Sequence, residues 1–219
     1  MSATSLPGWL YTDPKFFELE REKVFRQTWH IMGHISDAPN PGDYVTLDVL
    51  GDRVVTLRGQ DGELRSFHNV CRHRAAKLAP QSRGSCGHRL VCPYHAWSYT
   101  LEGALAGIPK WQGFESLDKS KHGLHPVEQE IYRGFIFVRF EKGLPSIADM
   151  MAPYTDELKP YALESLVPNG RVTLRGIVVD DREKTLCRES VSGLPGVQGV
   201  DDELRILVDS GRMVAHSID

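Results

Sequence analysis

The sequence has no apolar run long enough to span a bilayer, no run of Lys or Arg, and only four cysteines among 219 residues. A membrane-spanning helix needs about 20 consecutive apolar residues, so we predict no such segment. The formal net charge is −3, and the absence of a basic stripe argues against a nucleic-acid partner. Small molecules and other proteins are therefore the expected partners.

The N-terminus also lacks the features of a secretory signal. The stretch MSATSLPGWLYTDPKFF has neither a positively charged start nor a continuous apolar segment. We therefore expect a cytoplasmic protein. In that reducing compartment, clustered cysteines are more often metal ligands than disulfide partners.

Residues 1–40 are predicted to form an N-terminal helical segment. Asp13 is followed by Pro14 and then by KFFELEREKVFRQTW, which is the order of an N-cap residue and a proline at the first helical position. Apolar residues within this stretch give a partial hydrophobic face. The pattern predicts one helix over residues 14–28.

Residues 41–140 have the pattern of a β domain. GDYVTLDVL, DRVVTLRG and ELRSFHNV are short β-rich runs, and the hairpin signals Gly51-Asp52 and Asp61-Gly62 separate them. HRLVC, AWSYT and RGFIFVRF continue the series. Closely spaced strands without helices between them predict a mainly β fold, an antiparallel sandwich rather than βαβ units.

Two further segments follow the β domain. Residues 141–170 are predicted to be a helical connection that Pro153 and Pro160 interrupt. In residues 171–219, VTLRGIVV predicts a strand, but the rest has no sustained hydrophobic period. That composition leaves a domain remnant and a poorly ordered tail as alternatives.

The window CRHRAAKLAPQSRGSCGHRLVCPYHAW, residues 71–97, holds three of the four cysteines and three of the nine histidines. It contains Cys71-x-His73, then eighteen residues, then Cys92-x-x-His95. Two loops that each supply one thiolate and one imidazole can give one iron two Cys and the other iron two His. This is the ligand set of a Rieske [2Fe–2S] centre.

These residue types also suit other sites. Two Cys and two His also suit a structural zinc, although zinc sites usually repeat short Cys-x-x-Cys or His-x-x-His pairs. Cys86-Gly87-His88 is interpreted as an unligated turn in the long spacer. Cys187 has no neighbouring histidine and is interpreted as an ordinary thiol.

On these residues the chain resembles the N-terminal Rieske domain of the large subunit of ring-hydroxylating and related Rieske non-haem iron oxygenases. The usual family signature is CRHRG…CPYHGW, and PGDYVTL, DGELRSFHNVCRHRA and CPYHAWSYTLEGAL are also similar to family sequence, so that the resemblance covers about residues 9–175. Ala75 and Ala96 stand where the family commonly has Gly. Alanine there predicts loops that avoid positive φ.

The resemblance implies a Rieske-type antiparallel β-sandwich with an N-terminal helix and a short helical segment after it. It implies a [2Fe–2S] cluster with Cys71 and Cys92 on one iron, and His73 and His95 on the other. Tyr94 and Trp97 are candidates to cover the cluster, with ordinary core packing as the alternative. Arg72 and Arg74 are candidates to offset its charge, with a solvated surface role as the alternative.

The family also implies partners and a second metal. Electrons would come from a flavin-dependent reductase or a ferredoxin that draws on NAD(P)H, and pass to a mononuclear Fe(II), usually across a subunit contact in a trimer. That iron takes two His and an Asp in a C-terminal catalytic domain, and we find no such ligands. Asp118, His122 and His125 lie in a polar connection where the family does not place iron, and only His216 follows them.

Two interpretations of the whole chain remain. Residues 171–180 resemble the opening of the family's catalytic domain, and the resemblance then ends, which favours a truncated oxygenase subunit that pairs with a full-length subunit or forms a homotrimer. The alternative is a stand-alone small Rieske ferredoxin, or a non-redox interaction module. In every case we predict that the chain by itself carries out electron transfer at most.

Overall fold

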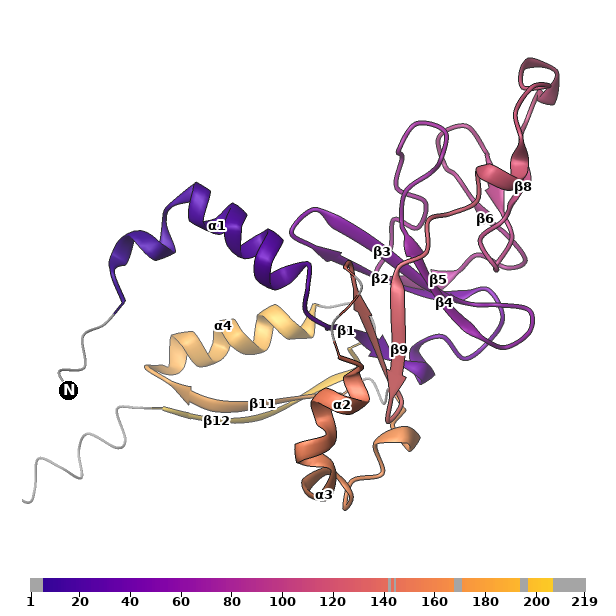
Figure 1. Ribbon diagram of the computed structural model, residues 1–219. Helices are drawn as coiled ribbons and strands as arrows, with labels where there is room; N and C mark the ends of the chain where they lie inside the picture. The colour runs from indigo at the N-terminus through magenta and orange to yellow at the C-terminus, as the bar shows by residue number, and fades with distance from the viewer. Residues whose placement is uncertain (1–5, 142, 144, 168–170, 194–196, 207–219) are drawn as a thin grey trace, which may run out of the picture. The chain divides into compact units, whose positions relative to one another are not determined.

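The computed structural model describes residues 6–141, 143, 145–167, 171–193 and 197–206. The chain divides into two units, Met1–Leu166 and Val167–Asp219, and Figure 1 shows the elements of each along the sequence. None of the helices within the described ranges combines the length and apolar character needed to cross a membrane.

The first unit begins with a helical segment, as predicted. A 3-10 turn (η1, Gly8–Tyr11) precedes α1 (Pro14–Glu20), which continues as a π-helical turn (η2, Arg21–Phe25). The Asp13 carboxylate accepts the backbone N–H groups of Lys15 and Phe16 at 2.7 and 3.0 Å, so Asp13 is the N-cap and Pro14 the first helical residue. The helical stretch ends at Phe25, three residues before the predicted end.

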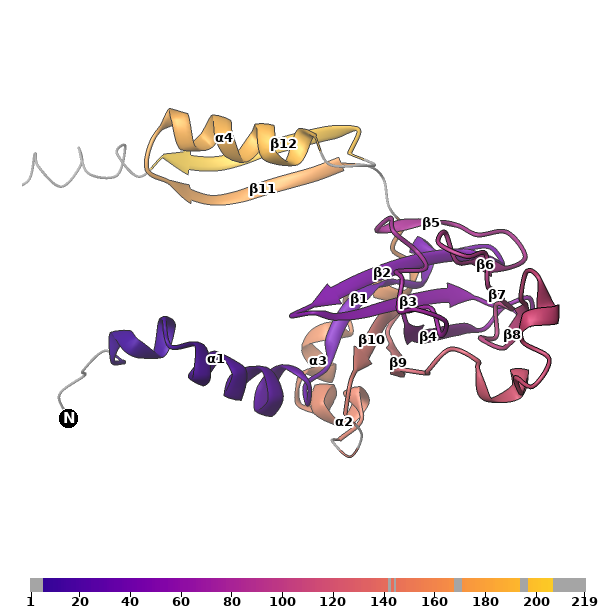
Figure 2. The same ribbon diagram turned by 90° about the horizontal axis from the view of Figure 1, so that it is seen from above.

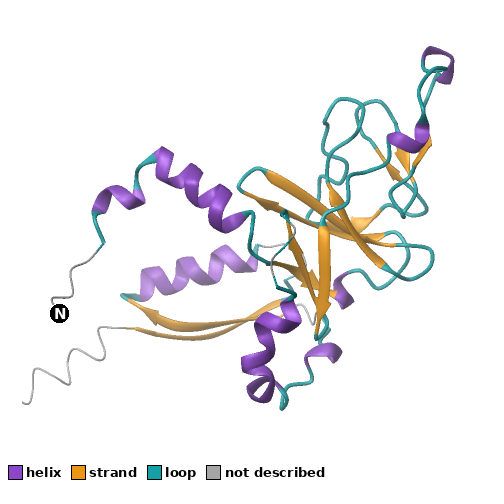
Figure 3. Ribbon diagram, viewed as in Figure 1, coloured by secondary structure: helices purple, strands orange, loops and turns teal. Residues whose placement is uncertain are grey.

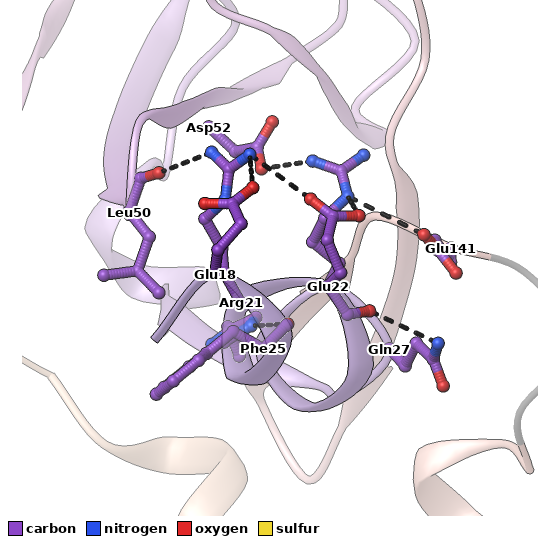
Figure 4. Close-up of polar contacts among 10 residues, drawn as sticks. Glu18, Arg21, Glu22, Phe25, Gln27, Leu50, Asp52 and Glu141 are labelled. Carbon is purple, nitrogen blue, oxygen red and sulfur yellow. Dashed lines mark hydrogen bonds and ion pairs between the residues drawn. The ribbon is translucent and has the colours of Figure 1, made fainter. Parts of the chain in front are cut away.

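Polar contacts attach this segment to the first β-hairpin of the same unit (Figure 4). Arg21 Nη1 donates to the Leu50 carbonyl at 3.5 Å, and Arg26 forms an ion pair with Asp52. Glu22 joins the network through Arg26, at 3.6 Å. Because no residue of α1 or η2 is buried, these polar contacts rather than a shared core set the helix against the hairpin.

Strands β1 to β10 form three antiparallel sheets, ordered β4-β3-β2-β5, β1-β10-β9 and β6-β7-β8. The antiparallel β fold predicted from sequence is confirmed, and β1 extends it to residues before 41. The strand bounds are β1 His30–His34, β2 Asp43–Val49, β3 Asp52–Arg58, β4 Leu64–His68, β5 Arg83–Ser85, β6 Leu90–Val91, β7 Ser98–Tyr99, β8 Leu105–Gly107, β9 Glu128–Tyr132 and β10 Phe135–Arg139.

The turn between β2 and β3 shows how local sequence sets the register. Val49 pairs with Asp52, so the two turn residues are Leu50 and Gly51, with φ of 48° and 94°. Positive φ at both positions is typical of a type I′ hairpin, and Gly51 adopts it without strain. The turn lies one residue earlier than the predicted Gly51-Asp52 pair.

Long loops dominate the part of the unit around β6, β7 and β8 (Figure 3). These strands have only two or three residues each, and the connection from β8 to β9 contains two short 3-10 turns, η4 (Trp111–Gly113) and η5 (Lys119–Lys121). One hydrophobic core lies beneath them and includes Cys71, Cys92 and Trp97. The core therefore holds the two loops that carry the metal-ligand motif.

The predicted helical connection after β10 is confirmed, including its interruptions. It consists of α2 (Ile147–Met151), η6 (Ala152–Tyr154), α3 (Thr155–Leu158) and η7 (Leu163–Ser165). Pro153 lies in η6, and α3 ends two residues before Pro160. Proline removes a helical N–H and clashes with the preceding turn, which accounts for the short pieces.

The second unit contains a parallel βαβ arrangement that was not predicted from the sequence. Strands β11 (Arg171–Val178) and β12 (Gly199–Ile206) pair in parallel, and α4 (Asp181–Ser192) lies along them (Figure 2). The Asp180 carboxylate caps α4 by accepting the Glu183 N–H at 2.7 Å. For the described residues 171–193 and 197–206 the expectation of a poorly ordered tail is wrong; residues 207–219 lie outside the described residues.

Candidate metal centre

Two loops of the same geometry carry the four predicted ligands. The first follows β4, and in it the Cys71 N–H donates to the Ala76 carbonyl at 2.8 Å. The second follows β6, and there the Cys92 N–H donates to the Trp97 carbonyl, also at 2.8 Å. The matched bonds fold both loops back on their cysteines, so each loop presents one Cys and one His side by side.

Ala75 and Ala96 occupy equivalent places in the two loops, and both have positive φ, 56° and 54°. Each N–H donates to the carbonyl of its loop cysteine at 3.0 Å, which closes the turn. The expectation that alanine would keep these loops out of positive φ is wrong, because the turn hydrogen bonds require the left-handed conformation. An L-residue in that conformation costs roughly 1–2 kcal/mol.

Replacing Ala96 by Gly is therefore expected to stabilise the protein. Glycine removes the left-handed strain but adds freedom to the unfolded chain, so we expect a net gain of about 0.5–1 kcal/mol in the free energy of unfolding. Chemical denaturation measures it. Ala76→Gly is the matched control, because Ala76 has no positive φ and packs on the core; equal stabilisation by both changes would contradict the explanation.

The two thiols form a buried pair. Cys71 and Cys92 are each 2% exposed, and their side chains interact directly. Burial raises the pKa of the Cys71 thiol, and the neighbouring Cys92 adds to this, although the Tyr99 hydroxyl and a backbone N–H oppose it. Two buried thiols become ligands most readily when a cation offsets the charge of their thiolates.

The two imidazoles form a second pair at the outer side of the loops. The ring centroids of His73 and His95 are 4.7 Å apart, and the His73 ring is stacked on Trp97 at 4.9 Å with an interplanar angle of 7°. His73 Nδ1 is buried and has no hydrogen-bond partner among the described residues. A buried polar atom without a partner requires an explanation, and a metal ion bound at Nδ1 supplies one.

The four side chains are arranged as two pairs rather than as one compact group. Within the described ranges, no three His, Cys, Asp or Glu side chains are grouped so that they could hold one metal ion. A single zinc would need three or four of these ligands around one point. Two ligands for each of two irons need only the two pairs, so the residues fit a [2Fe–2S] cluster better than zinc.

Tyr99 connects the two cysteine loops from below. Its side chain is fully buried, and its hydroxyl accepts the Arg72 N–H at 2.9 Å and lies 3.4 Å from Cys71 Sγ. Burial raises the pKa of Tyr99, so the hydroxyl keeps its proton; because its oxygen already accepts the Arg72 N–H, that proton is available to a Cys71 thiolate. Tyr99 was not among the residues predicted from the sequence, although its place on a strand next to a ligand loop could have indicated it.

Tyr99→Phe is expected to lower the reduction potential. A hydrogen bond to a charged group contributes about 1.5–3 kcal/mol, and about 59 mV corresponds to a tenfold change in a one-electron equilibrium, so a fall of up to roughly 65–130 mV is expected. Redox titration measures it. Tyr44→Phe is the control, since the Tyr44 hydroxyl lies over Gly84 in the same core; equal shifts in both variants would contradict the role of Tyr99.

The four candidate supporting residues, Arg72, Arg74, Tyr94 and Trp97, differ in their burial and contacts. Trp97 is 3% exposed and covers the His73 ring, whereas Tyr94 is 61% exposed and its ring lies 3.7 Å from that of His95. Arg72 contacts His125, and its Nε is buried without a hydrogen-bond partner among the described residues. Arg74 is exposed.

Residues set aside in the sequence have local structural roles. Cys86 Sγ donates to the Gly42 carbonyl at 3.3 Å. Asp118 caps η5 by accepting the Ser120 N–H, and His122 Nδ1 lies 2.8 Å from the Asp118 carbonyl. Cys187 is part of α4, and His216 lies outside the described residues.

A second contribution to the site, besides that of Tyr99, was not predicted from the sequence. Phe114, from the connection between β8 and β9, packs edge-on against His73 and Trp97 at 6.0 and 5.6 Å between centroids. Trp111 of the same connection packs on the core beneath the loops. This connection therefore covers one side of the imidazole pair, which no local sequence signal indicates.

Comparisons with known proteins agree with this geometry. Residues 28–118 match the Rieske [2Fe–2S] domain family, and residues 153–207 match the BON domain family. The chain is 38% identical over 162 residues to the glycine betaine monooxygenase oxygenase subunit of Chromohalobacter salexigens. The aligned region covers 74% of this chain and 36% of that relative. The chain thus spans about a third of the length of that relative.

Two solved structures are similar in fold. A quaternary ammonium Rieske monooxygenase in complex with its substrate L-carnitine has a TM-score of 0.65 at 34% identity, covering 71% of this chain and 44% of that chain. Naphthalene 1,2-dioxygenase with indole in the active site has a TM-score of 0.64 at 34% identity, covering 69% and 34%. Both similarities involve less than half of the longer protein.

Proposed function

Because residues 28–118 of this chain form a Rieske [2Fe–2S] domain of the type carried by Rieske oxygenase subunits, we propose that Cys71 and Cys92 hold one iron and His73 and His95 the other. The main support for this proposal is that the four side chains form a buried thiol pair and an outer imidazole pair, and that His73 Nδ1 has no hydrogen-bond partner among the described residues. Bound there, the cluster supplies one-electron transfer.

The side chains around the ligands shape that function. Trp97 and Phe114 keep water from the His73 ring, and Tyr99, whose hydroxyl lies 3.4 Å from the sulfur of Cys71, would donate a hydrogen bond to that sulfur as a ligand thiolate. His95 is exposed, so its ring offers a direct route between the cluster and a partner. Hydrogen bonds to the sulfurs and exposure to solvent are the means by which a protein tunes the potential of such a centre.

Rieske oxygenases receive electrons from reductase partners and can be oligomeric. We propose a flavin-dependent reductase or a ferredoxin as the donor for this chain, and a mononuclear iron of an oxygenase as the acceptor. The described residues do not group three metal ligands at one point, so the acceptor is not built from them. A homotrimer, or pairing with a full-length oxygenase subunit, would bring donor and acceptor sites together.

The second unit is proposed to be a separate α/β domain. Its strands pair with each other and α4 packs on them, and the BON family match ends at residue 207. This match favours a separate domain over the remnant of a catalytic domain. The first unit contains all four proposed ligands.

A reductive titration tests the electron-transfer role. We expect the purified chain to accept one electron reversibly, with a potential within the Rieske range of about −150 to +300 mV. A chain ending at Leu166 should titrate alike, since the first unit holds every proposed ligand. Absence of reversible reduction would support the alternative of a non-redox interaction module.

A further inference from the structure

Basic charge is concentrated in the segment that carries the two ligand loops and their covering connection. Residues 71–125 contain eight Lys and Arg against three Asp and Glu, whereas the other residues contain 18 against 26. The segment therefore has a formal charge of +5 in a chain whose remainder has −8. The net charge of the whole chain does not reveal this difference, because the positive charge of residues 71–125 largely cancels the negative charge of the other residues.

Besides Arg72, which contacts His125, four of these cations have no carboxylate partner among the described residues: Arg74, Arg89, Lys110 and Lys119. We call them the basic surface. Other cations of the segment are paired, as Lys77 is with Asp48 at 3.0 Å. Unpaired charge at a surface is free to interact with an oppositely charged partner.

Contacts relate the basic surface to the imidazole pair. Arg74 follows His73 directly, and its positive charge acts on that ring. Lys119 Nζ lies 4.5 Å from the centre of the Trp111 ring, and Trp111 belongs to the connection that covers the imidazoles.

The remaining two cations flank the second ligand loop. Arg89 immediately precedes β6, which leads into that loop, and its guanidinium lies beside Gly107 of β8. Lys110 is exposed and precedes η4. The cations of the basic surface thus lie next to both ligand loops and on the connection that covers the imidazoles.

An exposed aromatic group lies among these segments. Tyr94 is 61% exposed and its ring lies against His95, the exposed proposed ligand. An aromatic centre with a charged rim is the composition of many protein interfaces, in which Tyr is enriched. Because Tyr94 lies beside His95, a partner protein that contacts Tyr94 would lie next to the imidazole through which the electron is proposed to enter.

We propose that Arg74, Arg89, Lys110 and Lys119, around Tyr94, form the docking surface for an electron-donor protein with an acidic surface around its redox group. This inference rests on the proposed function. On docking, the reduced donor loses one electron and this chain gains it, with no bond made or broken. Charge complementarity raises the rate of encounter and fixes orientation, and the cations lie on segments that flank the ligand loops or cover the imidazoles.

The test uses the full cluster-loaded chain and an acidic plant-type [2Fe–2S] ferredoxin as the probe. Affinity is measured by calorimetry with both proteins oxidised, and electron transfer by stopped-flow mixing with the reduced probe. Both are measured at about 0.01 M and about 1 M salt, where the Debye length falls from about 30 Å to about 3 Å. Lys110→Glu with Lys119→Glu is the test variant, and Lys15→Glu with Lys23→Glu on the N-terminal helix is the control of equal charge change.

We expect binding and rapid reduction at low salt, loss of both at high salt, and an affinity at least about tenfold lower in the test variant than in the control. The single variant Arg89→Glu gives a second reading if the double variant folds poorly. Equal affinities in test and control variants, or tighter binding of a DNA duplex than of the ferredoxin, would overturn the inference. Reduction by dithionite separates the two proposals, because a chain that dithionite reduces but the probe does not bind keeps its proposed function.

Discussion

Cys92→Ser is expected to abolish cluster binding. A serine hydroxyl is a poor ligand for the iron of such a cluster, and the remaining buried Cys71 cannot hold that iron alone. We expect iron and acid-labile sulfide to fall to background, because a cluster with two protein ligands per iron does not survive the loss of one. Thermal stability should fall as well, since metal binding contributes to the free energy of folding.

Cys86→Ser is the matched control for that change. Cys86 lies in the same window of sequence, is partly buried and donates only to a backbone carbonyl. Its replacement should leave iron, sulfide and the visible spectrum intact. Loss of the cluster in the Cys86 variant, or retention in the Cys92 variant, would contradict the proposed ligand set.

His95→Cys is expected to keep iron but to lower the reduction potential strongly. A thiolate adds a negative charge that a neutral imidazole does not carry, so the electron enters a more negative site. All-Cys plant-type clusters have potentials of about −400 mV against about −150 to +300 mV for Rieske centres, so a fall of several hundred millivolts is the upper bound for replacing both histidines. One replacement should give on the order of half of it.

The potential of this variant is measured by spectroelectrochemical titration. The visible spectrum should change with it, because one iron exchanges nitrogen for sulfur. His88→Cys is the control, since His88 is exposed and its ring nitrogen lies 3.3 Å from the Gln60 side chain, away from the ligand loops. An unchanged potential in the His95 variant would remove His95 from the ligand set.

The antiparallel β fold and the Cys-x-His and Cys-x-x-His pairs were predictable, because local signals encode them. Turn residues such as Gly51 and short β-branched runs determine hairpins, and the spacing of Cys71, His73, Cys92 and His95 indicates two ligand loops. The division of these ligands into a thiol pair and an imidazole pair follows from both loops closing on their cysteine N–H groups.

Other features depend on contacts between distant segments and could not be predicted in this way. Phe114 reaches His73 only because the connection after β8 folds back over the loops. The positive φ of Ala96 is imposed by a turn hydrogen bond that outweighs the preference of alanine. Helix α4 carries few apolar residues, so its sequence has little periodicity, and packing on β11 and β12 stabilises it instead.

The most direct test of the account is the content of iron, zinc and acid-labile sulfide in the anaerobically purified chain. Two irons and two sulfides per polypeptide, without zinc, are expected from a cluster held by two Cys and two His. Zinc without sulfide would contradict the Rieske centre, and a third iron would show that the chain holds a further metal site that the described residues do not form.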